Sequence, residues 1–183
     1  FFFFKQKTAY EIPKRDWSSD VCSSDLLGDL ERSWLEFAAV LHDIGYLINP
    51  RQHHKHAYYL IKNSDIGGLT AEEIEVVANI ARYHRRALPS AKHEGYADLS
   101  LQLKRTVRIL SALLRVADAL DRTHFSAVQT VNVKIAQTLT IEAVVSGDAA
   151  MEIWSAAQRT DLLEQVFRRR VRFIESAQDS EQL

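Results

Sequence analysis

Residues 38–46, AAVLHDIGY, carry a histidine and a carboxylate side by side at the end of an apolar helical stretch. Upstream of His42, apolar residues recur at three- and four-residue steps, which predicts an amphipathic helix. Gly45 stands where a helix C-terminal cap is expected. Neighbours within a helix point about 100° apart, so His42 and Asp43 can reach one ion only at a helix end. The stretch therefore predicts a helical fold and a candidate metal site at the end of its first helix.

Three more helices are predicted downstream. His53 opens the second helix, and Thr70 with Glu73 has the spacing of a capping box at the start of a third. We expect His84 to continue the buried face of this third helix. The fourth and longest helix is predicted over residues 100–124, and its buried stripe is expected to consist of Leu103, Val107, Leu110, Leu114 and Ala117. Short links between these helices predict an all-α bundle.

After Ser126 the apolar period changes from a helical one to two, which is typical of strands. Two alternating runs predict a hairpin across residues 136–138. A helix containing Trp154 is expected next, and Val171 and Phe173 predict a last strand. The fold class is therefore mainly α, with a helical domain over 27–127 and a small α+β domain over 128–178, followed by a tail at 179–183.

Residues 1–26, FFFFKQKTAYEIPKRDWSSDVCSSDL, have neither a helical nor a strand period. They resemble the translation of a sequencing adapter, and the alternative is a disordered native extension. We expect no chemistry from this leader in either case.

The composition is that of an ordinary soluble protein, because 46% of the 183 residues are hydrophobic, 26% are charged and the net charge is -1. Without a basic excess, no nucleic-acid partner is expected. Cys22 is the sole cysteine, which excludes an internal disulfide framework and fits a reducing, cytoplasmic compartment. No apolar run approaches the roughly 20 residues of a membrane span. Because the chain does not begin with Met, we expect it to be a fragment.

The residues alone leave alternatives open. His42 and Asp43 can hold a metal, but an isolated pair of this kind more often meets the helix dipole or caps a neighbouring helix. Asp118 shares a helix face with Ser111 and Arg115, and periodicity alone favours a solvated stripe in which Asp118 pairs with Arg115 or Arg122. His84 is as consistent with a hydrogen-bonded core histidine as with an inward-facing ligand.

Four blocks taken together carry a more specific signal: AVLHDIGY at 39–46, HHKHAYYLI at 53–61, ARYHRRALP at 81–89 and LLRVADALDR at 113–122. Their order of His-Asp, His, His and Asp resembles that of the HD-domain metal-dependent phosphohydrolase superfamily. Within it, the blocks resemble the C-terminal HD-like domain of the exopolyphosphatase / guanosine pentaphosphate phosphohydrolase (Ppx/GppA phosphatase) family. The resemblance is close over 27–125 and looser over 128–178.

The resemblance implies an HD-like helical bundle followed by a small α+β subdomain, acting in homodimers on polyphosphate or guanosine pentaphosphate. It assigns His42, Asp43 and Asp118 as metal ligands, and His53 (or His56) and His84 as ligands of a second metal, with Mg or Mn as the expected ion. Two departures matter. The chain has no further histidine one helix upstream of His42, and it lacks the Gly-rich phosphate loops of the family's actin-like catalytic half.

Basic residues near the histidines fit a polyanion independently of the resemblance, because guanidinium groups suit phosphate oxygens. The alternative is solvated surface charge. The expected phosphate-binding residues are Arg51, Lys55, His56, Arg82, Arg85 and Arg86, and Lys62 accompanies them.

The sequence is therefore consistent with three functions. The leading one is a truncated exopolyphosphatase-family hydrolase whose present region binds and guides the polyanion and supports dimerisation. The second is a stand-alone metal phosphohydrolase that uses His42, Asp43 and Asp118. The third is an interaction module with a vestigial site.

Overall fold

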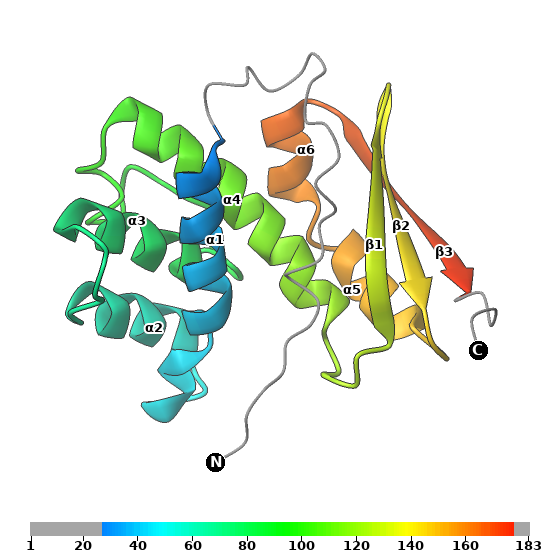
Figure 1. Ribbon diagram of the computed structural model, residues 1–183, viewed down its shortest axis with the longest axis horizontal. Helices are drawn as coiled ribbons and strands as arrows, with labels where there is room; N and C mark the ends of the chain where they lie inside the picture. The colour runs from blue at the N-terminus through cyan, green and yellow to red at the C-terminus, as the bar shows by residue number, and fades with distance from the viewer. Residues whose placement is uncertain (1–26, 178–183) are drawn as a thin grey trace. The chain divides into compact units, whose positions relative to one another are not determined.

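The computed structural model describes residues 27–177, and the predicted leader (1–26) and tail (179–183) both lie outside the described residues (Figure 1). The described residues divide into two compact units, 27–115 and 116–177. The predicted domain limits remain predictions. Within the described range, no helix is both long and apolar enough to cross a bilayer.

The first unit is helical, as the sequence predicts. Its elements are α1 (Asp29–Leu41), the 3-10 helix η1 (Ile44–Leu47), α2 (His53–Lys62), α3 (Ala71–Arg82) and most of α4 (Leu101–Leu120). The helix α3 packs against both α1 and α2, and η1 packs against α2. The core lies between these faces and includes Trp34, Ala57, Ile61, Val77, Ile80, Val107 and Leu110.

The start of α3 confirms the predicted capping box. The Thr70 backbone N–H donates to a Glu73 carboxylate oxygen at 2.7 Å, and the Glu73 N–H donates to the Thr70 hydroxyl at 3.3 Å. The two hydrogen bonds satisfy backbone donors that the first turn of a helix leaves without a partner. Local sequence therefore fixes where α3 begins.

Several local predictions are wrong. Gly45 does not cap α1, because the cap is His42 and Gly45 lies inside η1. The helix α4 ends at Leu120 rather than 124, and Ala117 is exposed rather than part of the buried stripe. His84 does not lie on α3 but two residues beyond its last residue, Arg82.

The polar face of α4 is not a solvated stripe. Ser111 is fully buried and Arg115 is 6% exposed. The Arg115 guanidinium donates to the backbone carbonyls of Tyr83 and Arg86, at 3.2 and 3.4 Å. These carbonyls flank His84, so α4 holds the turn that carries this histidine.

The second unit contains a three-stranded sheet with β2 (Thr138–Val145) between β1 (Val128–Ile135) and β3 (Arg170–Ala177) (Figure 1). The β1–β2 hairpin is antiparallel, and β3 lies parallel to β2. The helices α5 (Ala150–Ala157) and α6 (Asp161–Phe167) lie between β2 and β3 in the chain and pack on β3. The hairpin, α5 and β3 are as predicted, whereas α6 was not predicted.

Candidate metal centre

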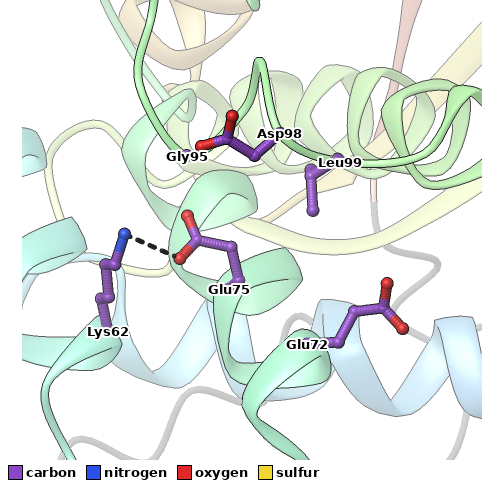
Figure 2. Close-up of a pocket in the computed structure, with 6 residues that line it drawn as sticks. All are labelled: Lys62, Glu72, Glu75, Gly95, Asp98 and Leu99. Carbon is purple, nitrogen blue, oxygen red and sulfur yellow. Dashed lines mark ion pairs between the residues drawn. The ribbon is translucent and has the colours of Figure 1, made fainter.

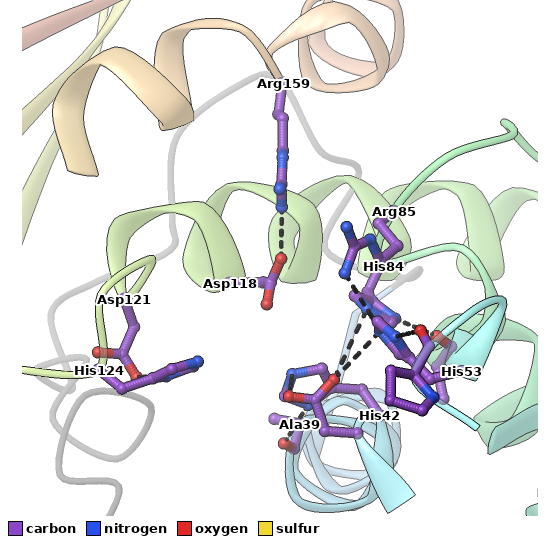
Figure 3. A network of polar contacts seen from close by, with 12 residues as sticks. Ala39, His42, His53, His84, Arg85, Asp118, Asp121, His124 and Arg159 are labelled. Atoms are coloured by element: carbon purple, nitrogen blue, oxygen red, sulfur yellow. Dashed lines mark hydrogen bonds and ion pairs between the residues drawn. The ribbon is translucent and has the colours of Figure 1, made fainter. Parts of the chain in front are cut away.

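Three histidines come together in the first unit (Figure 3), and one aspartate lies within 4 Å of all three. His42 caps α1, Asp43 follows it, His53 is the first residue of α2, and His84 follows the end of α3. The three imidazoles are buried, with exposed fractions of 6%, 2% and 0%, while the Asp43 side chain is 37% exposed. The ends of α1 and α3 and the start of α2 therefore form the site. We call these four residues the histidine cluster.

The carboxylate of Asp43 lies at the centre of the histidine cluster. Its Oδ2 is 3.5 Å from Nε2 of His42, and its Oδ1 is 3.4 Å from Nε2 of His53 and 3.9 Å from Nε2 of His84. One ligand atom from each of His42, Asp43 and His84 lies within 4.8 Å of the others. The structure thus brings together four of the five sequence-predicted metal ligands, of which His42, Asp43 and His84 form the group that could hold one ion.

The hydrogen bonds of the imidazoles determine which ring nitrogen faces the Asp43 carboxylate. Nδ1 of His42, His53 and His84 lies 2.7, 3.1 and 2.6 Å from the carbonyl oxygens of Ala39, Pro50 and Ala81, respectively. A carbonyl only accepts, so each ring donates from Nδ1 and, when neutral, keeps a lone pair on Nε2. Backbone carbonyls orient metal-binding histidines in this same way.

Nε2 of His53 and Nε2 of His84 are 3.2 Å apart. Two lone pairs at this distance repel one another unless a proton or a metal ion lies between them. Two nitrogens that each lie about 2.1 Å from one ion are roughly 3.0 to 3.4 Å apart at tetrahedral to octahedral angles. The donor set of imidazoles and a carboxylate therefore fits a divalent transition metal, and it suits Mn, Fe or Zn better than Mg, which prefers oxygen ligands.

Asp118, the fifth predicted ligand, belongs to the second unit. Its carboxylate accepts a hydrogen bond from the Arg159 guanidinium, and both side chains are mostly buried (Figure 3). Arg159 follows α5 and was not singled out from the sequence. The assignment of Asp118 as a metal ligand remains a prediction.

The basic residues divide into those near the histidine cluster and those engaged elsewhere. The Arg85 guanidinium donates to Nε2 of His53 at 3.4 Å, so this cation lies against the cluster (Figure 3). Arg82 instead lies over the rings of Tyr58 and Tyr83, at 5.0 and 5.7 Å. The predicted phosphate-binding residues Arg51, Lys55 and Arg86 are exposed, and His56 is half-buried.

Lys62 is engaged away from the histidine cluster, beside a pocket of about 200 Å³ (Figure 2). It pairs with Glu75 at 3.1 Å, and the Tyr58 hydroxyl donates to the same carboxylate at 2.7 Å. The pocket is also lined by Glu72 and Asp98. Three carboxylates against one lysine repel a polyanion, so this pocket is no phosphate site.

The surroundings of His54 show the electrostatic character of the neighbouring surface. Burial, reinforced by the nearby His53, Arg85, Lys55 and Arg86, lowers the pKa of His54 to about 4. His54 is therefore neutral at pH 7, and the positive field that disfavours its protonation also attracts anions.

A sequence model of the family described as Ppx/GppA phosphatase, domain III, matches residues 6–162. A protein named guanosine-5'-triphosphate,3'-diphosphate pyrophosphatase from Pseudoalteromonas translucida (strain TAC 125) is 31% identical over 103 residues, which cover 51% of this chain and 20% of the relative. A protein of the same name from Vibrio parahaemolyticus serotype O3:K6 (strain RIMD 2210633) is 36% identical over 76 residues, covering 42% and 15%. The alignments thus span a fifth of these relatives or less.

Proposed function

Because the chain belongs to the Ppx/GppA phosphatase family, we propose that it binds phosphate chains at a divalent metal centre formed by the histidine cluster. The proposed role is within an enzyme that removes terminal phosphate from inorganic polyphosphate or guanosine pentaphosphate. Both named relatives are guanosine-5'-triphosphate,3'-diphosphate pyrophosphatases, which supports the nucleotide as a substrate. The observation that carries the metal centre is the convergence of one ligand atom from each of His42, Asp43 and His84 within 4.8 Å of the others, with His53 against the same carboxylate.

The residues of the cluster have distinct roles in this proposal. Asp43 supplies the negative charge that offsets the cation, and its partly exposed carboxylate marks the side open to solvent. The imidazoles of His42, His53 and His84 supply neutral nitrogen ligands that backbone carbonyls hold in place. Arg85 offers a guanidinium to phosphate oxygens beside them. A bound divalent ion would supply Lewis-acid polarisation of a phosphoryl oxygen.

Equilibrium dialysis of Mn²⁺ against the 183-residue chain tests the metal centre. We expect stoichiometric binding that Asp43→Asn weakens at least tenfold, while the exposed Asp65→Asn serves as a matched control with unchanged affinity. Inorganic tripolyphosphate should then bind in an Mn²⁺-dependent way, and Arg85→Gln should weaken it. Absence of metal binding by the folded chain would contradict the proposal.

The same chain can be assayed for activity of its own. Mn²⁺-dependent phosphate release from tripolyphosphate, abolished by Asp43→Asn, would support a stand-alone phosphohydrolase that uses His42, Asp43 and Asp118. Binding without release would support a phosphate-binding region of a longer enzyme, which is our leading proposal. Support of homodimer formation by this region is a further part of the proposal, and light scattering of the chain tests it.

A further inference from the structure

Gly45 brings the turn after α1 into close contact with α2. A Cβ at this position would lie 2.0 Å from the carbonyl oxygen of His53 and 2.6 Å from the backbone nitrogen of Ala57. Both are backbone atoms that cannot move aside cheaply. Only glycine allows the turn to lie this close to α2. Because of this close approach, the next residue, Tyr46, lies directly against His53 of the histidine cluster.

The ring of Tyr46 stacks on the imidazole of His53, with centroids 4.0 Å apart and an interplanar angle of 19°. His53 covers one ring face, yet 47% of Tyr46 is exposed, so the exposed part is the opposite face and the ring edge. The next two residues are also apolar and exposed, Leu47 by 83% and Ile48 by 51%. The proposed metal centre is therefore next to an exposed face of the Tyr46 ring, and the exposed apolar residues Leu47 and Ile48 follow this tyrosine in the chain.

We propose that Tyr46 is a stacking surface for the base of a purine nucleoside polyphosphate whose phosphates bind at the histidine cluster. This inference rests on the proposed function, and it adds recognition of the nucleoside to binding of the phosphates. Aromatic side chains bind bases because every base has a π-face that gains by stacking. Inorganic polyphosphate has no ring that could stack on Tyr46. The Arg85 guanidinium, in contrast, can bind the phosphates of either ligand.

A purely structural role of Tyr46 makes a different prediction. If the ring serves only to orient His53, its removal disturbs the metal centre and weakens every phosphate ligand alike. If the ring binds the base, its removal weakens the nucleotide and leaves the bare phosphate chain unchanged. The two ligands measured on one variant therefore separate the two roles.

Isothermal titration calorimetry of the full chain in one Mn²⁺ buffer, with guanosine pentaphosphate and with inorganic tripolyphosphate, makes this test. We expect Tyr46→Ala to weaken the nucleotide about tenfold or more, the usual loss when a stacking aromatic is removed, and to leave tripolyphosphate unchanged. Tyr46→Phe keeps the ring and should bind both ligands as the wild type does. Tyr59→Ala is the matched control, because Tyr59 on α2 is 63% exposed and lies outside the cluster.

A second variant covers the case in which Tyr46→Ala does not fold. Tyr46→Trp keeps a stacking face, and its added fluorescence should be quenched by guanosine pentaphosphate but not by tripolyphosphate. Equal weakening of both ligands in Tyr46→Ala, or wild-type affinity for the nucleotide no greater than for tripolyphosphate, overturns the base-stacking role and leaves the proposed phosphate site standing. Wild-type chain that binds neither ligand overturns both.

Discussion

Nε2 of His53 faces Nε2 of His84 at 3.2 Å, although each ring already donates its Nδ1 hydrogen to a backbone carbonyl. In the neutral rings both facing atoms carry lone pairs, and the Arg85 guanidinium donates to that of His53. Both imidazoles are almost fully buried. A divalent ion coordinated by both Nε2 atoms would replace their repulsion with attraction.

Divalent metal should stabilise the folded chain. At a free Mn²⁺ concentration 100 times the dissociation constant, binding adds about 2.7 kcal/mol to the free energy of unfolding. We expect thermal melts in Mn²⁺ to show a higher midpoint than melts in EDTA. His84→Ala should lose this difference, while His124→Ala, which changes an exposed histidine of the second unit, should retain it. Identical melts of the wild type in Mn²⁺ and EDTA would contradict the prediction.

The replacement of Gly45 by alanine should destabilise the chain. The added Cβ meets backbone atoms of α2 at 2.0 and 2.6 Å, and overpacking of this kind costs about 1 to 3 kcal/mol or more. Gly67→Ala is the control, because its Cβ meets nothing within 4 Å. Urea unfolding should show a lower midpoint for Gly45→Ala and an unchanged or higher one for Gly67→Ala. Equal midpoints would show that the close approach is not present in solution.

The depressed pKa of His54 predicts a loss of stability in mild acid. The pKa falls from an ordinary value of 6.5 to about 4 on folding, chiefly because of burial. Below pH 6.5 the unfolded chain therefore binds a proton that the folded chain does not, and stability decreases until pH 4. The limiting slope for one such group is about 1.4 kcal/mol per pH unit.

The variant His54→Gln tests this assignment, because glutamine does not titrate. Between pH 7 and pH 4.5 the wild type should lose more stability in urea titrations than His54→Gln does. Other histidines titrate in both proteins, so the difference between the two slopes isolates His54. Parallel slopes would assign the acid sensitivity to other groups.

Asp118 and Arg159 should be energetically coupled. Their side chains are only 17% and 18% exposed, so removal of one partner leaves the other charge poorly solvated. A double-mutant cycle with Asp118→Asn and Arg159→Gln should give a coupling free energy of about 1 to 3 kcal/mol. Additive effects of the two substitutions would contradict the coupling.

The same Asp118→Asn variant tests the ligand assignment that the family resemblance supplies. Weakening of Mn²⁺ affinity by tenfold or more would place Asp118 among the metal ligands. Unchanged affinity would restrict the metal centre to the histidine cluster. Arg159→Gln serves as the control for any effect that arises only from the broken ion pair.

Repeated apolar periods in the sequence were sufficient to predict α1, α3, α4 and the β1–β2 hairpin, whereas α2, α5 and β3 were predicted from fewer apolar positions, such as Val171 and Phe173 in β3. The helix α6 was missed because its seven residues, DLLEQVF, are too short to establish a period. The capping residues Thr70 and Glu73 act within one turn, so local sequence determined the start of α3 correctly.

The candidate ligands His42 and Asp43 are neighbours at a helix end, but their assignment came from the family resemblance of four sequence blocks and stays a prediction. Only the tertiary structure decided that His53 rather than His56 joins them, and that Arg115 is a buried clamp rather than a solvated charge. It also placed Tyr46 on His53. Contacts between residues far apart in the chain depend on how closely two helices approach, and that distance is set by the packing of the core rather than by any local period.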